Sequence, residues 1–447
     1  MADENAANEN TPVAADEKAP VIVSYQHLSE KVSKALADNP EGLIKATQEP
    51  APVGFEADEP PATDQEAAQF MDDLAKALDY LEKQEKVPGV LTSPDDRFTS
   101  LLQSHFARKS LEERKVEPVE SGGFEAKFDE RDIVGWAKSL FTWIQRLDPY
   151  PWQTASPTPD PLPNKVRAAV LGDWGTGLYG APKCAESIQK EEYGLLLHLG
   201  DVYYSGTKDE VNDRFLKLWP KNPGAVSRAC NSNHEMYTGG RSYFKETLKK
   251  FEQKASYFAH QNDHWLLVGL DSGYEEGKLA GDQVAWLQGL LAGAGDRRVV
   301  LFSHHQPFSW KETPGAQLNK QLGELLKGKK LFGWYWGHEH RCMIYDQHPA
   351  WGLHGRCVGH SGYPYFADKT DAGTLGAKGA QDAVWRRVET KNTVPGGSIL
   401  EGPNIYLTGE EKKYGPNGYM TLEFDDDHLN EVVHTPDGER IFERQLV

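Results

Sequence analysis

Acidic and imidazole side chains recur between residues 172 and 360, each beside a glycine or at the end of an apolar run. In chain order they lie in the stretches Gly172-Asp173-Trp174-Gly175, Gly200-Asp201-Val202-Tyr203-Tyr204, Asn233-His234-Glu235, Ser303-His304-His305, Gly337-His338-Glu339-His340 and Gly359-His360. Carboxylate and amide oxygens and imidazole nitrogens are ligands for divalent and trivalent metal ions. The pattern therefore indicates a hydrolytic site that holds two metal ions.

Each stretch also has a structural explanation when it is taken alone. A Gly-Asp pair is usually a turn, and Gly-His-Glu-His is compatible with a surface loop. Their order, each after an apolar run, favours one common site. Within that site the register Ser-His-x-x-x-Phe-Ser favours His304 over His305 as the metal ligand. His198, which lies inside an apolar run, is interpreted as a core residue.

Composition narrows the class of protein. A chain of 447 residues exceeds what one core usually organises, so we expect two domains or one domain with a long appendage. The 67 acidic residues outnumber the 49 Lys and Arg, which argues against broad binding to nucleic acid or to an anionic membrane. The four cysteines contain no C-x-x-C pair, and the N-terminus has no signal-peptide pattern. We therefore expect a cytoplasmic protein with free thiols.

The chain divides into segments of different texture. Residues 1–20 are acidic and poor in apolar side chains, so we expect a disordered tail. Residues 21–148 show helical periodicity, with Ser93-Pro94 as the start signal of one helix. Residues 149–164 are rich in proline and predict an extended linker. Residues 165–447 are assigned to the catalytic domain.

Within the catalytic domain, short apolar runs alternate with amphipathic stretches. Five runs predict buried strands: 166–171, 194–199, 265–270, 299–302 and 331–336. The stretches 209–218, 241–252 and 282–291 predict helices. This alternation favours a layered α/β or α-β-β-α architecture. The polar stretches fall just after the runs, where open sheets place their ligand sites.

Over residues 165–430 the order of these motifs resembles the calcineurin-like metallophosphoesterase superfamily. The resemblance implies a four-layer α-β-β-α sandwich of two mixed sheets flanked by helices, here with a helical N-terminal region. In most of that superfamily a histidine stands two residues after the first aspartate, where this chain has Gly175. The form Gly-Asp-Trp-Gly resembles the purple acid phosphatases, which have a tyrosine three residues after the second aspartate. Tyr204 occupies that position, although Tyr203 precedes it directly.

The resemblance also implies a ligand set for each ion. The first ion would be held by Asp173, Asp201, Tyr204 and His340, and the second by Asp201, Asn233, His304 and His338, with Asp201 bridging them. Two ions about 3.5 to 4 Å apart lower the pKa of a shared water, so that a metal-bound hydroxide becomes the nucleophile. A tyrosine ligand favours iron(III), with zinc, manganese or a second iron as the other ion, while cobalt also suits this ligand set.

Further residues receive roles from their neighbourhood. His234 is the candidate acid for the leaving group, and Glu235 would orient its ring. His305, Tyr237 and His360 are candidate substrate contacts, although His360 is equally well explained as a turn residue bonded to backbone. Ser232 stands where the family has a glycine, and a left-handed backbone there would cost about 1 kcal/mol. On that expectation, Ser232→Gly would repair activity.

The predicted function is hydrolysis of phosphate monoesters on a phosphorylated small molecule or nucleotide. A phosphodiesterase or a pyrophosphate hydrolase acting on nucleotides is the alternative within the same chemistry. A non-enzymatic alternative is an interaction protein, in which the helical N-terminal region binds a protein partner and the metal site is vestigial or structural. A weaker alternative makes that region a lid on the site.

Overall fold

The computed structural model describes residues 63–83, 96–113, 116–118, 124–126, 147–313, 315–367, 384–407 and 411–447, together with Lys34, Ala37, Leu140 and Ile144. The predicted disordered tail, residues 1–20, lies outside the described residues. The same is true of Ser93 and Pro94, the predicted start signal of one helix.

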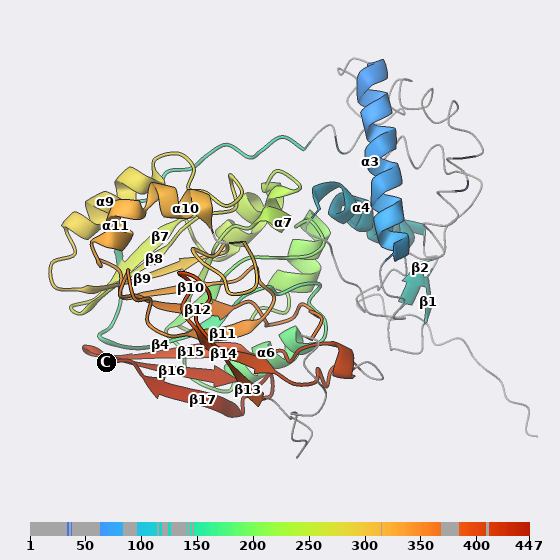
Figure 1. Ribbon diagram of the computed structural model, residues 1–447. Helices are drawn as coiled ribbons and strands as arrows, with labels where there is room; N and C mark the ends of the chain where they lie inside the picture. The colour runs from blue at the N-terminus through green and yellow to red at the C-terminus, as the bar shows by residue number, and fades with distance from the viewer. Residues whose placement is uncertain are drawn as a thin grey trace, which may run out of the picture.

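Two mixed β-sheets form the body of the molecule (Figure 1). The larger sheet has the described strand order β13 (Val384–Val388), β14 (Gly397–Glu401), β11 (Cys342–Tyr345), β12 (His354–Val358), β10 (Gly333–Trp336), β9 (Arg298–Ser303), β8 (Trp265–Gly269), β7 (Phe258–Gln261) and β3 (Asp160–Pro161). The smaller sheet has the order β17 (Arg440–Gln445), β16 (His428–His434), β15 (Tyr419–Asp425), β4 (Lys165–Leu171), β5 (Leu195–His198) and β6 (Val226–Ala229).

The core between the two sheets follows from the alternation of side chains along each strand. On β4, Val166, Ala168 and Val170 face the other sheet and pack in one cluster with side chains of β8, β9 and β10. Ala169 and Leu171 point the opposite way, into a second cluster. Because both faces are buried, the strand is a continuous apolar run. The five predicted strands are confirmed as β4, β5, β8, β9 and β10.

Helices cover the outer face of each sheet. The larger sheet packs against α9 (Gln283–Ala292), α10 (Ala316–Gln321) and α11 (Gly323–Lys327). The smaller sheet packs against α6 (Gly180–Ile188), η2 (Glu210–Leu216), η3 (Tyr243–Thr247) and α8 (Leu248–Lys250). The predicted four-layer α-β-β-α sandwich is therefore confirmed. Two of the expected helices, η2 and η3, contain π-helical turns.

The described part of the N-terminal region includes the helices α3 and α4 and the antiparallel pair of β1 (Val116–Pro118) and β2 (Phe124–Ala126). Helix α3 (Asp64–Lys83) starts at a capping box, because Thr63 Oγ1 accepts from the Glu66 amide at 3.2 Å and the Glu66 carboxylate accepts from the Thr63 amide at 2.8 Å. Helix α4 (Arg97–Glu113) begins later than the Ser93-Pro94 signal. Its cap is Asp96, whose carboxylate accepts from the Thr99 amide at 2.7 Å.

The proline-rich segment is not a free spacer. Tyr150 stacks on Phe244 with ring centroids 5.1 Å apart, and its amide donates to the Gly239 carbonyl at 2.7 Å. Trp152 stacks on Tyr257 at 5.4 Å. Residues 160–161 then form β3 at the edge of the larger sheet. The segment therefore lies on the catalytic body, while the division into domains stays a prediction.

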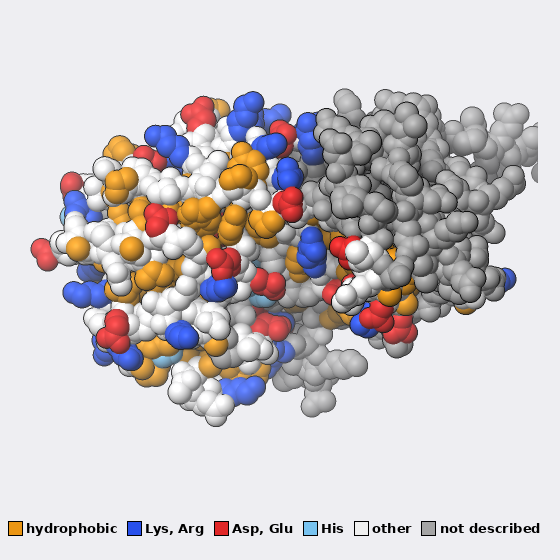
Figure 2. Space-filling view, turned by 90° about the horizontal axis from the view of Figure 1, so that it is seen from above, with side chains coloured by type: hydrophobic (Ala, Val, Ile, Leu, Met, Phe, Trp, Pro, Cys, Tyr) orange, Lys and Arg blue, Asp and Glu red, His pale blue; other side chains and the backbone are white. Residues whose placement is uncertain are grey.

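The distribution of charged side chains on the surface and the state of the cysteines agree with what the composition predicts. On the face of Figure 2, described Lys and Arg side chains alternate with Asp and Glu and form no continuous basic patch. All four cysteines, Cys184, Cys230, Cys342 and Cys357, are buried free thiols. Among the described residues, no helix combines the length and the apolar character needed to cross a membrane.

Candidate active site

The predicted site residues come together at the carboxyl ends of parallel strands. Asp173 follows β4, Asp201 follows β5, and Asn233 begins the short helix α7 (Asn233–Met236) after β6. His304 follows β9, and His338 and His340 follow β10. Loops at strand ends can aim side chains without disturbing the sheet. The two sheets thus deliver their polar residues to one place.

Several of these residues have a strained backbone. Asp173, Asp201, His338 and His340 adopt φ values of 55°, 76°, 68° and 50°. Residues other than glycine rarely occupy this left-handed region, and such outliers concentrate at functional sites. Gly200 has a φ of 103°, and a Cβ there would lie 2.9 Å from His304 Nδ1. The glycine before Asp201 is therefore required for the close approach of these two loops.

The first cluster surrounds one oxygen of Asp201. The Tyr203 hydroxyl lies 2.7 Å from Asp201 Oδ2 and 2.6 Å from His340 Nε2. His340 Nε2 in turn lies 3.5 Å from Asp173 Oδ1 and 3.7 Å from Asp201 Oδ2. Asp173 itself accepts the His338 amide at 2.9 Å. Two carboxylates, a phenol and an imidazole thus share one small volume.

The tyrosine of this cluster is Tyr203, which corrects the prediction of Tyr204. The Tyr204 ring lies with its centroid 5.7 Å from the Arg214 guanidinium, and its carbonyl accepts from His234 Nδ1 at 2.6 Å. The two tyrosines lie in a turn, and the Tyr203 hydroxyl is the one that contacts Asp201 and His340.

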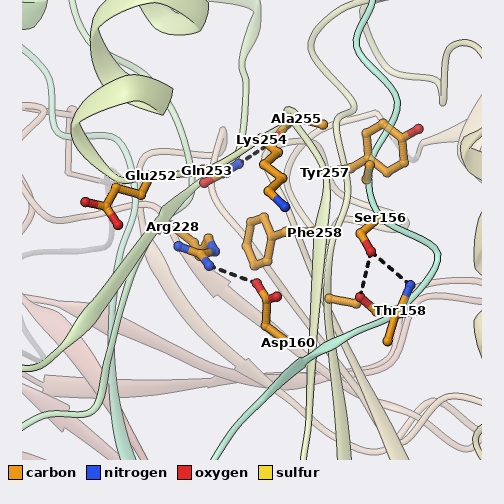
Figure 3. A pocket seen from close by; sticks show the side chains of 12 residues that line it. Ser156, Thr158, Asp160, Arg228, Glu252, Gln253, Lys254, Ala255, Tyr257 and Phe258 are labelled. Carbon is orange, nitrogen blue, oxygen red and sulfur yellow. Dashed lines mark hydrogen bonds and ion pairs between the residues drawn. The ribbon is translucent and has the colours of Figure 1, made fainter.

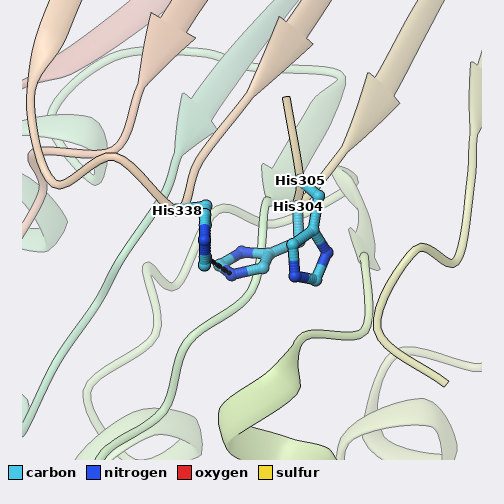
Figure 4. A group of neighbouring side chains, drawn as sticks. All are labelled: His304, His305 and His338. Carbon is cyan, nitrogen blue, oxygen red and sulfur yellow. Dashed lines mark hydrogen bonds between the residues drawn. The ribbon is translucent and has the colours of Figure 1, made fainter. Parts of the chain in front are cut away.

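The second cluster surrounds the other oxygen of Asp201. His304 Nε2 lies 3.3 Å from Asp201 Oδ1, 3.0 Å from Asn233 Oδ1 and 3.2 Å from His338 Nδ1. Figure 4 shows the His304 and His338 rings meeting through these nitrogens. The Asn233 oxygen faces inward because the amide nitrogen donates to the Tyr237 hydroxyl at 2.9 Å.

The protonation of His304 decides what this cluster can do. Its Nδ1 lies 2.9 Å from the Leu199 carbonyl, which only accepts, so the ring proton is on Nδ1. Burial lowers the pKa of His304 to about 4, outweighing the nearby Asp201 charge, and the ring is neutral near pH 7. Nε2 therefore presents a lone pair to two oxygens. Such a set of facing electron-pair donors is complete only with a cation.

The two aspartates show the same need for a cation. Asp201 Oδ1 is buried and receives no hydrogen bond from the described residues. Burial raises the pKa of Asp173 well above its usual range, and the Asp201 charge adds to the increase. For Asp201 the neighbouring His304, His234 and His340 outweigh the effect of burial and hold the pKa well below its usual range. Without a cation, the low pKa of Asp201 and the high pKa of Asp173 favour one negative charge on the pair. Beside a metal ion, both carboxylates would be charged.

His234 lies beside the first cluster. The Tyr204 carbonyl accepts from Nδ1, and the ring packs edge to face on Tyr203 with centroids 4.1 Å apart. The role of Glu235 in orienting this ring stays a prediction. Its carboxylate accepts from the Ser232 hydroxyl and, at 3.2 Å, from the Asp201 amide. Burial, together with the Asp201 charge, raises the pKa of Glu235 to about 8.

His305 is buried beside the second cluster. Its ring centroid is 4.6 Å from that of His338, and the three histidines 304, 305 and 338 could hold one ion between them (Figure 4). Ser272 Oγ lies 3.0 Å from His305 Nδ1 and accepts the His305 amide at 3.0 Å. His305 Nε2 is buried and has no hydrogen-bond partner among the described residues. This nitrogen is suited to a ligand that enters the site.

The remaining predicted contacts behave differently. Tyr237 orients Asn233 through its hydroxyl. The His360 ring is fully buried against Gly418, and both its nitrogens lack a hydrogen-bond partner among the described residues. The structure does not place it in either cluster. His198 is a core residue as predicted, with its ring 4.4 Å from that of Phe215.

Ser232 does not have the left-handed backbone conformation that was expected because the family has a glycine at this position. Its φ of −132° and ψ of 173° are extended, so serine causes no left-handed strain and the predicted cost of about 1 kcal/mol is wrong. Its hydroxyl instead donates to Glu235 and accepts the Asp201 amide at 3.2 Å. Ser232 therefore helps to hold the loop of the central aspartate.

Two residues beside the clusters, Tyr363 and Ser272, were not among the site residues predicted from the sequence. Tyr363 stacks on His340 with ring centroids 3.9 Å apart. Ser272 positions His305, and a signal for it existed. The stretch Asp271-Ser272-Gly273 follows the run that forms β8, in the same strand-end position as the other motifs.

A separate pocket lies at the β3–β7 edge of the larger sheet. It is lined by Asp160, Arg228 and Phe258, among others, and Figure 3 shows the Arg228 guanidinium turned to the Asp160 carboxylate, 3.0 Å away. None of the predicted site residues lines it. The converging motifs, rather than this pocket, mark the candidate active site.

Comparison with known proteins agrees with this site. Residues 166–342 match the family model of the calcineurin-like phosphoesterases. The match contains Asp173, Asp201, Asn233, His304, His338 and His340. No curated protein sequence matches the chain.

Solved structures with a similar course of the chain include three that can be described here. A purple acid phosphatase from yellow lupin (Lupinus luteus) seeds has 14% identity and a TM-score of 0.44, covering 67% of this chain and 55% of its own. GAP50, described as the anchor in the inner membrane complex of Plasmodium, has 12% identity and a TM-score of 0.41 over 63% and 88%. A dimetal phosphatase from Danio rerio has 11% identity and a TM-score of 0.39 over 63% and 98%. The chain thus spans little more than half of the lupin protein.

Proposed function

We propose that this protein hydrolyses phosphate monoesters at a dinuclear metal centre built around Asp201. The main support for the proposal is that three atoms with free electron pairs, and without protons, point toward one another. His304 Nε2, Asn233 Oδ1 and Asp201 Oδ1 face one another, and each is turned that way by a hydrogen bond or by its backbone. This arrangement is electrostatically unfavourable in an empty, buried volume and favourable around a cation.

The two clusters correspond to two ligand sets that share Asp201. Oδ2 faces the set of Asp173, Tyr203 and His340, and Oδ1 faces the set of Asn233, His304 and His338. Both sets lie within the family match, and in the first set Tyr203 takes the place of the tyrosine that the motif spacing indicated. A mixed oxygen and nitrogen set of this kind accepts iron, zinc, manganese or cobalt, and the phenol favours iron(III) at the first position.

When bound, two such ions polarise the phosphoryl oxygens and lower the pKa of a water molecule until it is nucleophilic near neutral pH. The chain's own residues would supply the remaining steps. His305 Nε2 would contact a phosphoryl oxygen. His234 would transfer a proton at Nε2 to the leaving oxygen, since its Nδ1 proton is held by the Tyr204 carbonyl.

The choice of a monoester, and of the purple acid phosphatase-like branch, is supported by the chain's own sequence. Gly175 replaces the histidine found in most of the superfamily, and a tyrosine takes part in the first cluster. A phosphodiesterase or a nucleotide pyrophosphatase would use the same ligand sets and differ in the surrounding loops. A phosphorylated small molecule or a nucleotide is the proposed substrate in either case.

The proposal is tested by turnover of p-nitrophenyl phosphate and of bis-p-nitrophenyl phosphate, before and after chelation, with the metal content of the same sample measured. Two metal ions per chain and chelator-sensitive hydrolysis of the monoester are expected. His304→Ala should lose metal and activity, while His428→Ala, on an exposed side chain, is the matched control. A preference for the diester would establish the phosphodiesterase alternative. Loading with metal but no turnover of any ester would favour the interaction protein instead.

A further inference from the structure

Residues 99–105 of helix α4 are buried on all sides of the helix, although several of them are polar. Each side chain from Thr99 to His105 is at most 5% exposed. A helix on a protein surface normally buries one stripe and leaves the other face in water. Buried hydroxyl and amide groups are costly unless they are hydrogen-bonded. The polar residues of α4 therefore mark an interior element with specific partners, although α4 lies outside the part of the chain that matches the family.

One of these partners is the loop that carries Tyr203. The Ser104 hydroxyl donates to Glu210 Oε1 at 2.8 Å and also contacts the Ser205 hydroxyl. Since Ser104 has one proton, Ser205 is the donor in the second bond. The other oxygen of Glu210 accepts the amides of Ser205 and Thr207, at 3.2 and 2.9 Å. Ser104 thus closes a buried network that fixes the chain directly after Tyr203 and Tyr204.

A second partner is the turn that follows the candidate ligand Asn233. Arg97 Nε donates to the Tyr237 carbonyl at 3.2 Å, and the Tyr237 hydroxyl orients Asn233. Arg97 and Ser104 are seven residues apart and therefore lie on the same face of α4. Figure 1 shows this helix beside α7. The two contacted segments also meet each other, because Thr238 Oγ1 donates to the Ser205 carbonyl at 2.9 Å.

We propose that α4 belongs to the catalytic unit, with Ser104 and Arg97 as positioning residues for the loop of Tyr203 and the turn of Asn233. The inference rests on the proposed function only for its effect on turnover. It assigns the N-terminal helix a role that differs from a lid and from a docking arm, because a lid or an arm would be released without changing the site. Release of α4 would instead loosen one ligand from each cluster.

The experiment uses the full chain with Ser104→Ala, which removes the hydroxyl that joins Ser205 and Glu210. Amide hydrogen exchange over residues 203–210 should become faster. The kcat for p-nitrophenyl phosphate should fall between about 10- and 100-fold, because small misplacements of site groups have effects of this size. KM should change little. Ser104→Thr, which keeps the hydroxyl, should restore both measurements toward the parent values.

The matched control is Thr63→Ala, which removes the exposed cap of α3 in the same N-terminal region. It should leave exchange at 203–210 and kcat unchanged. Arg97→Gln provides a second variant if Ser104→Ala fails to fold, and it should speed exchange around residues 233–238. Unchanged exchange and unchanged kcat in a folded Ser104→Ala protein would overturn the inference.

Exchange and turnover separate this inference from the proposed function. If the parent protein hydrolyses no phosphate ester, the proposed function fails, yet faster exchange at 203–210 in Ser104→Ala still supports positioning by α4. If Ser104→Ala only lowers the melting temperature, with normal kcat and normal exchange, α4 has a purely structural role and the inference is wrong.

Discussion

Asp201 is the residue on which both clusters depend. Its Oδ2 lies near Tyr203 and His340, and its Oδ1 lies near His304. A left-handed backbone holds it in this orientation, and its amide donates to two acceptors, the Ser232 hydroxyl and the Glu235 carboxylate. A single carboxylate could then bind two ions, because each of its oxygens faces a different set of ligands.

The clearest prediction at the residue scale concerns the two adjacent tyrosines. Tyr203→Phe removes the hydroxyl that contacts Asp201 and His340, so we expect metal affinity or kcat to fall by about 10- to 100-fold. Tyr204→Phe, the same change one position later, is the matched control and should have a much smaller effect. Metal content and turnover of p-nitrophenyl phosphate measure both.

Visible absorption provides an independent test of the choice between Tyr203 and Tyr204. If the first position holds iron(III), a tyrosine ligand gives visible absorption, and Tyr203→Phe should remove it while Tyr204→Phe retains it. A larger loss in Tyr204→Phe than in Tyr203→Phe would contradict the assignment and return the role to the residue that motif spacing had indicated.

At the scale of elements, the sequence predicts what depends on local pattern and fails where the pattern is ambiguous. The apolar runs of β4, β5, β8, β9 and β10 are visible because parallel strands are buried on both faces. The ligands are visible because they follow these runs. The choice between Tyr203 and Tyr204 depends instead on the backbone conformation of the turn that contains them, which residue types do not specify. Ser272 was missed because one serine after a strand carries little information without its partner, His305.

The short helix α7 gives the second prediction. Since Ser232 is extended, Ser232→Gly relieves no strain and removes the hydroxyl that serves both Glu235 and the Asp201 amide. We expect the free energy of unfolding to fall by about 1 to 3 kcal/mol, the cost of an unmatched buried polar group, and kcat to fall or stay level. Thermal unfolding and turnover measure these effects.

Ser232→Ala separates the two features of that substitution, because it removes the hydroxyl without adding backbone freedom. It should reproduce most of the loss. A Ser232→Gly protein more active than its parent would show that the glycine of the family pattern is preferred here after all, against the observed backbone conformation.

At the scale of the whole molecule, a buried ion pair joins the two sheets that deliver the ligands. Arg356 on β12 and Glu431 on β16 are both fully buried, with guanidinium-to-carboxylate distances of 2.8 Å for Nε to Oε1 and for Nη2 to Oε2. Tyr335 on β10 donates to the same carboxylate at 2.6 Å. The pair lies in the layer between the sheets, where, among the described residues, each supplies the only charge that neutralises the other's.

Removal of one partner should therefore destabilise the whole fold. We expect Glu431→Ala to lower the free energy of unfolding by about 3 to 5 kcal/mol, because the Arg356 charge is left buried without its counterion. Denaturant unfolding measures this value. The exposed pair of Arg387 and Asp346 is the control, and Asp346→Ala should cost about 1 kcal/mol or less.

The combined change Arg356→Met, Glu431→Leu and Tyr335→Phe tests what the pair contributes beyond avoiding an unpaired charge. Apolar side chains of similar volume often replace a buried ion pair without loss of stability. The triple variant should therefore recover most of the stability that Glu431→Ala loses. If the triple variant is stable but turns over substrate more slowly, the pair also fixes the relative position of the two sheets. That position sets the distance between the ligands that follow β4 and β5 and the ligands that follow β9 and β10. A triple variant no more stable than Glu431→Ala would show that the geometry of the pair itself holds the sandwich together.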